Sequence, residues 1–143
     1  MNNVSTNDIR NIAIVGHGSE GKTVLTEAML FNAGVTDRLG RVEDGTTTTD
    51  YDPEEIKRQI SISAALAPLK WNGHKVNVID VPGYFDFIGE MIQALRVVDG
   101  AIIVVGAVSG LAVGTEKAWD YCEEYGIPKL VFINQMDREH VNF

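Results

Sequence analysis

Residues 16–23, which read Gly-His-Gly-Ser-Glu-Gly-Lys-Thr, constrain the fold of this chain more than any other stretch. They follow an apolar run over residues 12–15, and their glycines allow backbone angles that a Cβ forbids, so successive N–H groups can turn inward around an anion. A strand, a loop of this spacing and then a helix are typical of a phosphate-binding loop. The residues predicted to contact nucleotide phosphates are Gly16, His17, Gly18, Ser19, Glu20, Gly21, Lys22 and Thr23.

Two side chains of this loop carry specific chemistry. Lys22 supplies a positive charge beside the β and γ phosphates, and the hydroxyl of Thr23 is placed to coordinate Mg²⁺. The helix that starts here points the positive end of its dipole at the phosphates. A glycine-rich turn without a ligand is the alternative, but a strand before it and a helix after it favour the phosphate-binding loop.

The rest of the chain alternates strand and helix patterns, which predicts an α/β fold. Strands are predicted over residues 8–15, 60–66, 76–80, 101–105 and 130–133. Helices are predicted over residues 23–33, 88–95 and 115–125, the first with an apolar face of Leu25, Ala28, Met29 and Phe31. Asn72 and Gly73 predict a tight hairpin that makes the second and third strands antiparallel. Residues 35–58 have no clear period and are expected to form a functional or mobile loop.

The third predicted strand ends at Asp80, which is followed by Val81, Pro82 and Gly83. An aspartate at this point can hold Mg²⁺, usually through water, while the N–H of Gly83 can reach a terminal phosphate. Taken alone, this spacing is more often a simple turn. Its place one hairpin after a phosphate-binding loop favours a nucleotide site that includes Asp80, Val81 and Pro82.

The fifth predicted strand runs into Asn134, Gln135, Met136 and Asp137, at the end of a strand where α/β folds bind ligands. A carboxylate at Asp137 can accept the N1 and N2 protons of guanine, a pairing that adenine cannot offer. Turns with Asn and Asp are common, so the order of the three motifs matters here. They predict binding of GTP or GDP, and an adenine-using phosphotransferase or kinase is the weaker alternative.

Composition narrows the class of protein further. The chain has 143 residues, 45% of them hydrophobic, which suits one domain with a core. Its formal charge of −8 argues against direct nucleic acid binding by this segment. The longest aliphatic run, residues 101–105, is too short to span a bilayer, and the polar N-terminus has no signal-peptide pattern. We therefore expect a cytoplasmic protein without membrane contact, with its single cysteine, Cys122, in the core.

Along nearly its whole length the chain resembles the N-terminal part of a translational GTPase, closest to elongation factor G and its elongation-factor-G-like paralogues. Residues 50–62 are similar to the first switch of that family, and residues 80–87 stand for Asp-Thr-Pro-Gly-His-Val-Asp-Phe. The resemblance implies the P-loop GTPase fold, a mostly parallel sheet of order 2-3-1-4-5-6 with strand 2 antiparallel and helices on both faces. It also implies Mg²⁺-dependent GTP hydrolysis on the ribosome, in translocation or a related step. Ser61 then joins Thr23 and Asp80 as a metal-binding residue.

The chain departs from the family at four positions. Ser61 replaces a threonine, Gln135 replaces the lysine of Asn-Lys-x-Asp, and Ser19 replaces a residue that is often aspartate. Tyr84 stands where the family has the histidine that orders the attacking water, so Tyr84 and Gly83 are the candidate catalytic residues. A phenol can bind water but cannot be a cation at pH 7. A GTP or GDP switch with little turnover is therefore an alternative. Tetracycline-type ribosomal protection proteins resemble the same family and are a further alternative.

The resemblance also implies that residues 1–143 are part of a GTP-binding domain that ends shortly after Asp137. The family domain continues to a further strand and helix. We expect the isolated chain to expose an apolar strand edge over residues 130–133 and to self-associate through it.

Overall fold

The computed structural model describes residues 4–139 and 141. In chain order the elements are η1 (Thr6–Asp8), β1 (Ile9–Gly16), α1 (Lys22–Asn32), α2 (Pro53–Arg58), β2 (Ala65–Trp71), β3 (His74–Asp80), η2 (Phe85–Phe87), α3 (Ile88–Leu95), β4 (Gly100–Gly106), α4 (Val113–Glu124) and β5 (Lys129–Asn134).

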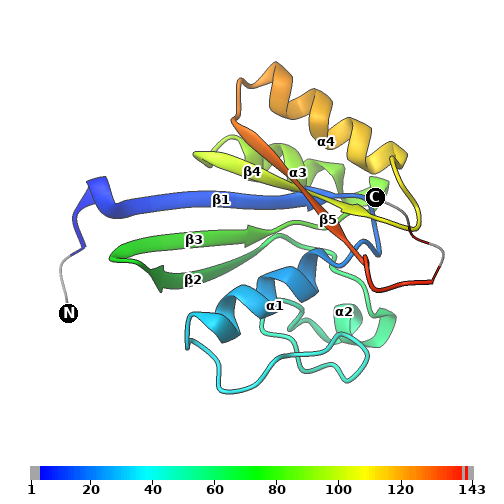
Figure 1. Cartoon of the computed structure of the whole chain (residues 1–143), viewed down its shortest axis with the longest axis horizontal. Helices are drawn as coiled ribbons and strands as arrows, with labels where there is room; N and C mark the ends of the chain where they lie inside the picture. Colours follow the sequence, from blue (N-terminus) through cyan, green and yellow to red (C-terminus); the bar gives the residue numbers. More distant parts are fainter. Residues whose placement is uncertain (1–3, 140, 142–143) are drawn as a thin grey trace.

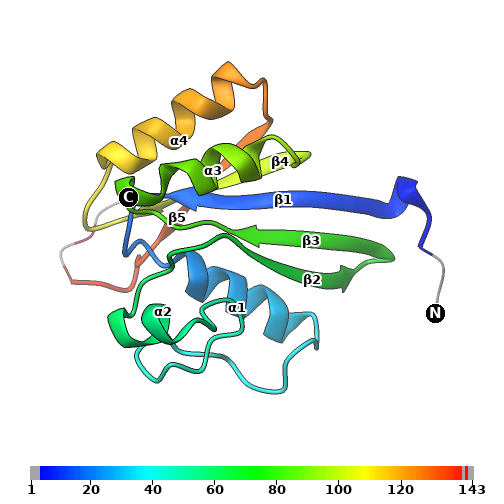
Figure 2. The same ribbon diagram turned by 180° about the vertical axis from the view of Figure 1, so that it is seen from behind.

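The strands form one sheet of order β2-β3-β1-β4-β5, which confirms the predicted topology. β2 runs antiparallel to β3, and the other neighbouring strands are parallel. Figures 1 and 2 show α1 and α2 on one face of the sheet and α3 and α4 on the other. The molecule is thus a three-layer α/β sandwich, as predicted.

β1 lies in the middle of the sheet and contributes to the core on both of its faces. Ala13 and Val15 pack with Leu95 of α3 and neighbouring residues, while Ile14 packs with Leu30 of α1 on the opposite face. Side chains of a strand alternate between faces, so an apolar run is what a strand covered on both sides requires. The continuous run before the phosphate-binding loop therefore correctly predicted a central strand.

The predicted second strand, residues 60–66, was wrong. β2 begins at Ala65, and its buried residues are Ala65, Ala67 and Leu69, whereas Leu66 is 64% exposed. The apolar alternation before it belongs instead to a loop that carries Ser61. Small alanine side chains provide a weak signal for the inward face, although they allow α1 to pack closely on it.

Residues 35–58 contain a short helix, α2, that the loop prediction missed. The side chain of Asp52 accepts a hydrogen bond from Glu54 N, and Glu55 Oε2 accepts one from Asp52 N at 3.2 Å. This capping box, with Pro53 in the first turn, is a local start signal that was present in the sequence.

The predicted buried face of α1 was also partly wrong. Phe31 is 44% exposed, while Thr26 and Glu27 are buried together with Leu30. A buried glutamate needs hydrogen-bond donors, and those of Glu27 come from the loop that follows α1.

β5 lies at one edge of the sheet and pairs with β4 in the described part of the chain. Leu130, Val131, Phe132 and Ile133 are each between 38% and 55% exposed. Self-association through this strand stays a prediction. None of the helices within the described residues combines the length and the hydrophobicity that a membrane span needs.

Candidate nucleotide-binding site

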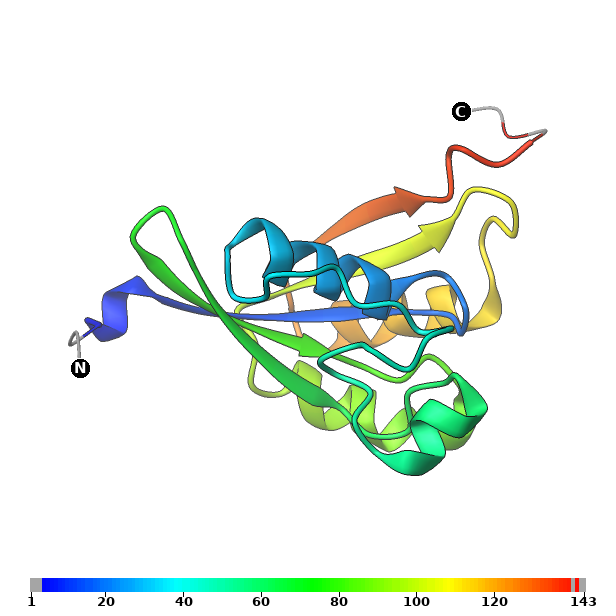
Figure 3. The same ribbon diagram turned by 90° about the horizontal axis from the view of Figure 1, so that it is seen from below.

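The three predicted motifs meet at the carboxyl ends of the parallel strands. The register pairs Ile14 of β1 with Asp80 of β3, and Gly106 of β4 with Asn134 of β5. Figure 3 shows that the loops after β1, β4 and β5 lie at the same end of the molecule. Carboxyl ends of parallel strands form the usual ligand site of such sheets, and the topology creates that site here.

The phosphate-binding loop joins β1 to α1 and holds Lys22 at its end. Lys22 is 6% exposed, and its Nζ donates a hydrogen bond to the carbonyl of His17 at 2.5 Å. Burial lowers its pKa to about 8. A Cβ on Gly83 would clash with Lys22 Nζ and with the N of Gly18, so only a glycine lets the backbone after β3 approach the loop this closely. The arrangement can surround an anion with N–H groups and one ammonium.

A cluster of oxygen atoms lies beside the start of α1. The hydroxyls of Thr23 and Ser61 are 3.2 Å apart, and Ser61 donates a hydrogen bond to Asp50 Oδ1 at 2.7 Å. Thr49 donates to Asp80 Oδ2 at 2.9 Å, while the buried Asp80 Oδ1 has no hydrogen-bond partner among the residues that the structure describes. Hydroxyl and carboxylate oxygens, completed by water and phosphate oxygens, are the ligands that Mg²⁺ prefers. The predicted set of Thr23, Ser61 and Asp80 therefore fits that metal.

Electrostatics of this cluster also favour a cation. Burial raises the pKa of Asp80 to about 6, and the nearby charge of Asp50 adds to that rise. Burial likewise raises the pKa of Asp50 above its usual value, against the hydrogen bond from Ser61. A divalent cation would offset the cost of burying two carboxylates. Sequence reasoning assigned no role to Asp50, because its contact with Ser61 depends on how the loop folds.

Three glutamates from three helices hold the segment over residues 46–64 in place. They are Glu27 of α1, Glu55 of α2 and Glu90 of α3. They accept hydrogen bonds from Thr48 N at 2.5 Å, Ile62 N at 2.9 Å, Ser63 N at 3.1 Å and Ala64 N at 2.7 Å. The contact to α3 ties this segment to the one that follows Asp80. Sequence reasoning missed these acceptors, since their partners lie between 7 and 26 positions away in the chain and form no local pattern.

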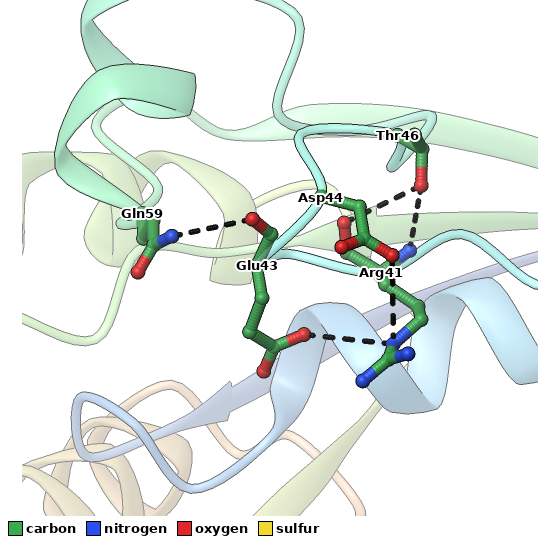
Figure 4. A network of polar contacts seen from close by, with 5 residues as sticks. All are labelled: Arg41, Glu43, Asp44, Thr46 and Gln59. Carbon is green, nitrogen blue, oxygen red and sulfur yellow. Dashed lines mark hydrogen bonds and ion pairs between the residues drawn. The ribbon is translucent and has the colours of Figure 1, made fainter.

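Figure 4 shows a polar network in the loop before this segment. Arg41 Nε lies 3.9 Å from a carboxylate oxygen of Glu43 and 3.8 Å from one of Asp44, and Gln59 Nε2 donates to the Glu43 carbonyl at 3.4 Å. Exposed ion pairs of this length stabilise little. Their position matters more, because Val42, Glu43 and Gln59 line the same cavity as the phosphate-binding loop.

Tyr84 lines the same cavity as the phosphate-binding loop. Its phenol oxygen lies 3.2 Å from Ser19 Oγ, and its ring packs on Gly18, where a Cβ would come within 2.9 Å of the ring. The side chain is 37% exposed. Gly83 precedes it against Lys22, so the two candidate catalytic residues face the loop, while Val81 and Pro82 are buried behind them.

The segment after β5 is attached to the phosphate-binding loop. Asn134 Nδ2 donates to the carbonyl of Glu20 at 2.9 Å, and Gln135 Nε2 donates to the carbonyl of Ser19 at 3.3 Å. Met136 and Asp137 are exposed. Asn134 therefore positions this segment, and the Asp137 carboxylate lies at the surface where a base could reach it.

Two side chains of the loop point away from the phosphate position. Glu20 is 4% exposed and accepts a hydrogen bond from Ser109 Oγ at 2.7 Å, in the loop between β4 and α4. The ring of His17 packs against Gly114 of α4. Both residues can therefore offer a ligand their backbone N–H groups, while their side chains attach the loop to neighbouring elements.

Comparison with known proteins gives consistent matches. The family described as elongation factor Tu GTP binding domain matches residues 7–143. Ribosome-releasing factor 2, mitochondrial, from Candida dubliniensis is 44% identical over 143 residues, which are 100% of this chain and 18% of that protein. Elongation factor G 2 from Streptomyces coelicolor is 45% identical over 130 residues, 91% of this chain and 19% of that protein. The chain thus spans about a fifth of the length of these curated relatives.

Solved structures match in the same way. A crystal structure of a Thermus thermophilus protein is 47% identical with a TM-score of 0.88, and the match covers 90% of this chain and 20% of that one. The bacterial selenocysteine-specific elongation factor EF-Sec is 27% identical with a TM-score of 0.72, with the same coverage.

Proposed function

The chain belongs to the elongation factor Tu GTP-binding domain family, and from that premise we propose that it binds GTP and GDP and hydrolyses GTP in a translation factor of the elongation factor G type. The full-length protein would act on the ribosome, in translocation or a related step such as the release for which the Candida relative is named. One observation carries the proposal. The phosphate-binding loop, the oxygen cluster around Asp80 and the segment ending at Asp137 all lie at the carboxyl ends of the parallel strands.

The roles of the residues follow from this arrangement. Lys22 and the backbone N–H groups of residues 18–22 bind the phosphates, and Asp137 selects guanine. Thr23, Ser61 and, through water, Asp80 would hold Mg²⁺. The metal would supply positive charge beside the phosphate oxygens. Ser61 keeps the hydroxyl of the family threonine, and its hydrogen bond to Asp50 limits the rotation that the missing methyl would otherwise allow.

Gly83 and Tyr84 are the proposed catalytic residues. The N–H of Gly83 reaches the terminal phosphate, and the phenol of Tyr84 orders the attacking water by a hydrogen bond. A phenol is neutral at pH 7, so it adds no positive charge to the transition state. Intrinsic hydrolysis should therefore be slow. A guanine-nucleotide switch with little turnover is the second candidate function, and the presence of Tyr84 is the observation that favours it.

The experiment is the rate of phosphate release from GTP by the full-length protein, per site, with and without ribosomes. Ribosome-stimulated turnover supports the first candidate, and nucleotide binding without turnover under both conditions supports the second. Tyr84→His should raise the stimulated rate, while Tyr84→Phe should lower whatever rate remains. Equal rates in all three proteins would remove Tyr84 from the mechanism.

A ribosomal protection protein of the tetracycline type would share the same domain. Its assay is rescue of translation in the presence of tetracycline. Direct nucleic acid binding by this segment is not proposed, given the formal charge of −8.

A cytoplasmic location stays the sequence-based prediction, and the Candida relative is named as mitochondrial.

A further inference from the structure

Tyr84 and Gln135 both contact Ser19, and all three are positions at which the sequence predicts a departure from the family. Ser19 Oγ lies 3.2 Å from the phenol oxygen of Tyr84, and the Ser19 carbonyl accepts a hydrogen bond from Gln135 Nε2 at 3.3 Å. These residues come from the phosphate-binding loop, the segment after β3 and the segment after β5. Ser19 is therefore the point at which all three segments of the site meet.

The backbone of Ser19 adopts a conformation that few serines adopt. Its φ is 63°, in the left-handed region that favours glycine. Such a conformation is strained for a residue with a Cβ and persists only where the surroundings determine it. It places the Ser19 hydroxyl toward Tyr84 while the carbonyl faces Gln135.

The Tyr84 ring makes one packing contact and one polar contact with the phosphate-binding loop. The hydroxyl-bearing end of the ring packs against Gly18, and Tyr84 is 37% exposed, so part of it faces solvent. Among the described residues, the one hydrogen-bond partner of the phenol is Ser19 Oγ. Without that partner, nothing polar would fix the phenol above the loop.

We propose that Ser19 is a positioning residue whose hydroxyl holds the Tyr84 phenol over the phosphate-binding loop, in the cavity that Gly83 and Lys22 also line, before a nucleotide binds. Either oxygen can donate the hydrogen bond in this pair, so the phenol is free to donate its own hydrogen bond to water or to a phosphate oxygen when the terminal phosphate arrives. The kinetic part of this inference rests on the proposed GTP hydrolysis, whereas the contact itself does not.

The first test is spectroscopic and needs no activity. Fluorine NMR of the full-length protein labelled with 3-fluorotyrosine reports each ring, and loss of one resonance in Tyr84→Phe assigns that of Tyr84. Ser19→Gly and Ser19→Ala both remove the hydroxyl, but glycine relaxes the left-handed backbone and alanine does not. Both should shift the Tyr84 resonance. Ser109→Ala, which removes a different hydroxyl bonded to the same loop, should leave it in place. An unshifted Tyr84 resonance in both Ser19 variants would overturn the inference.

The second test is a double-mutant cycle on single-turnover GTP hydrolysis. A neutral hydrogen bond contributes about 0.5 to 1.5 kcal/mol, so Ser19→Gly, Ser19→Ala and Tyr84→Phe should each slow hydrolysis about 2- to 12-fold. Because the residues act together, combining Ser19→Gly with Tyr84→Phe should slow it no further. The affinity for GDP should instead differ between Ser19→Gly and Ser19→Ala, since it depends on the backbone conformation of the phosphate-binding loop.

Multiplicative losses in the double variant, or hydrolysis that differs between the two Ser19 variants as GDP affinity does, would show that Ser19 acts through the loop and not through Tyr84. Absence of hydrolysis in the parent protein would refute the proposed GTPase activity alone. The fluorine spectrum would still decide whether Ser19 holds Tyr84.

Discussion

Replacing Glu55 by alanine should release the segment that carries Ser61. Glu55 is 3% exposed, and its Oε1 accepts hydrogen bonds from Ile62 N at 2.9 Å and Ser63 N at 3.1 Å. Its Oε2 accepts a third, from Asp52 N at 3.2 Å. No other side chain in the described residues ties the start of α2 to the residues next to Ser61 in this way.

The magnitude follows from the number and type of these bonds. A hydrogen bond to a charged group contributes about 1.5 to 3 kcal/mol, and the three bonds share one desolvated carboxylate, so their sum is reduced. We expect the free energy of local opening to fall by about 2 to 4 kcal/mol, which is roughly a 30- to 1,000-fold change in the opening equilibrium. Alanine is a good helix former, so a lower helix propensity is not the cause.

The assay is amide hydrogen exchange, residue by residue, at Ile62 and Ser63. Glu54→Ala is the matched control, because Glu54 is next to Glu55 in α2 but makes exposed ion pairs with Lys57 at 3.9 Å and Arg58 at 2.9 Å. Such pairs contribute about 0 to 1 kcal/mol. Equal exchange rates at Ile62 and Ser63 in the two variants would refute the reasoning that Glu55 holds this segment.

Three further predictions concern the nucleotide and the metal. Lys22→Ala removes a charged contact and should weaken GTP binding about 10- to 150-fold in an equilibrium titration; unchanged affinity would place the phosphates elsewhere. Asp137→Asn should lower the preference for GTP over ATP in a competition titration, because an amide offers one acceptor where guanine needs two. In metal-free, nucleotide-free protein, burial raises the Asp80 pKa from 3.8 to about 6, so its protonated form favours the fold. That stabilisation is present below the unfolded pKa and is lost as the pH rises through about 6, so urea unfolding from pH 4 to 8 should show the free energy of unfolding of the parent falling relative to that of Asp80→Asn as the pH rises.

The phosphate-binding loop and the alternation of strands and helices could be predicted because their signals are local. Gly16 and Gly21 adopt positive φ angles that favour glycine, and the apolar run before them is what a central strand requires. The order of the strands came from the family resemblance and was confirmed. The start of α2 was equally local, in its capping box, and was missed only because the surrounding segment has no periodicity.

Partners for the polar side chains depended on tertiary structure. Ser61 was predicted as a metal ligand, but its hydrogen bond to Asp50 joins residues of a segment in which Glu55 also accepts a hydrogen bond from Ile62 N, and neither contact has a local sequence pattern. The inward face of β2 was assigned one residue off, since alanines carry too little hydrophobic signal to set a register that α1 decides by packing.

Residues 19 and 84 show most clearly what the sequence predicts and what depends on the tertiary structure. That Ser19 and Tyr84 are candidate site residues can be predicted from the sequence, because each stands in a local motif. That the two side chains belong together follows from the fold, since 65 residues separate them and their oxygens come within 3.2 Å through the parallel pairing of β1 and β3. A contact across that distance in the chain has no local pattern, and the free energy that forms it comes from the sheet and its two apolar faces.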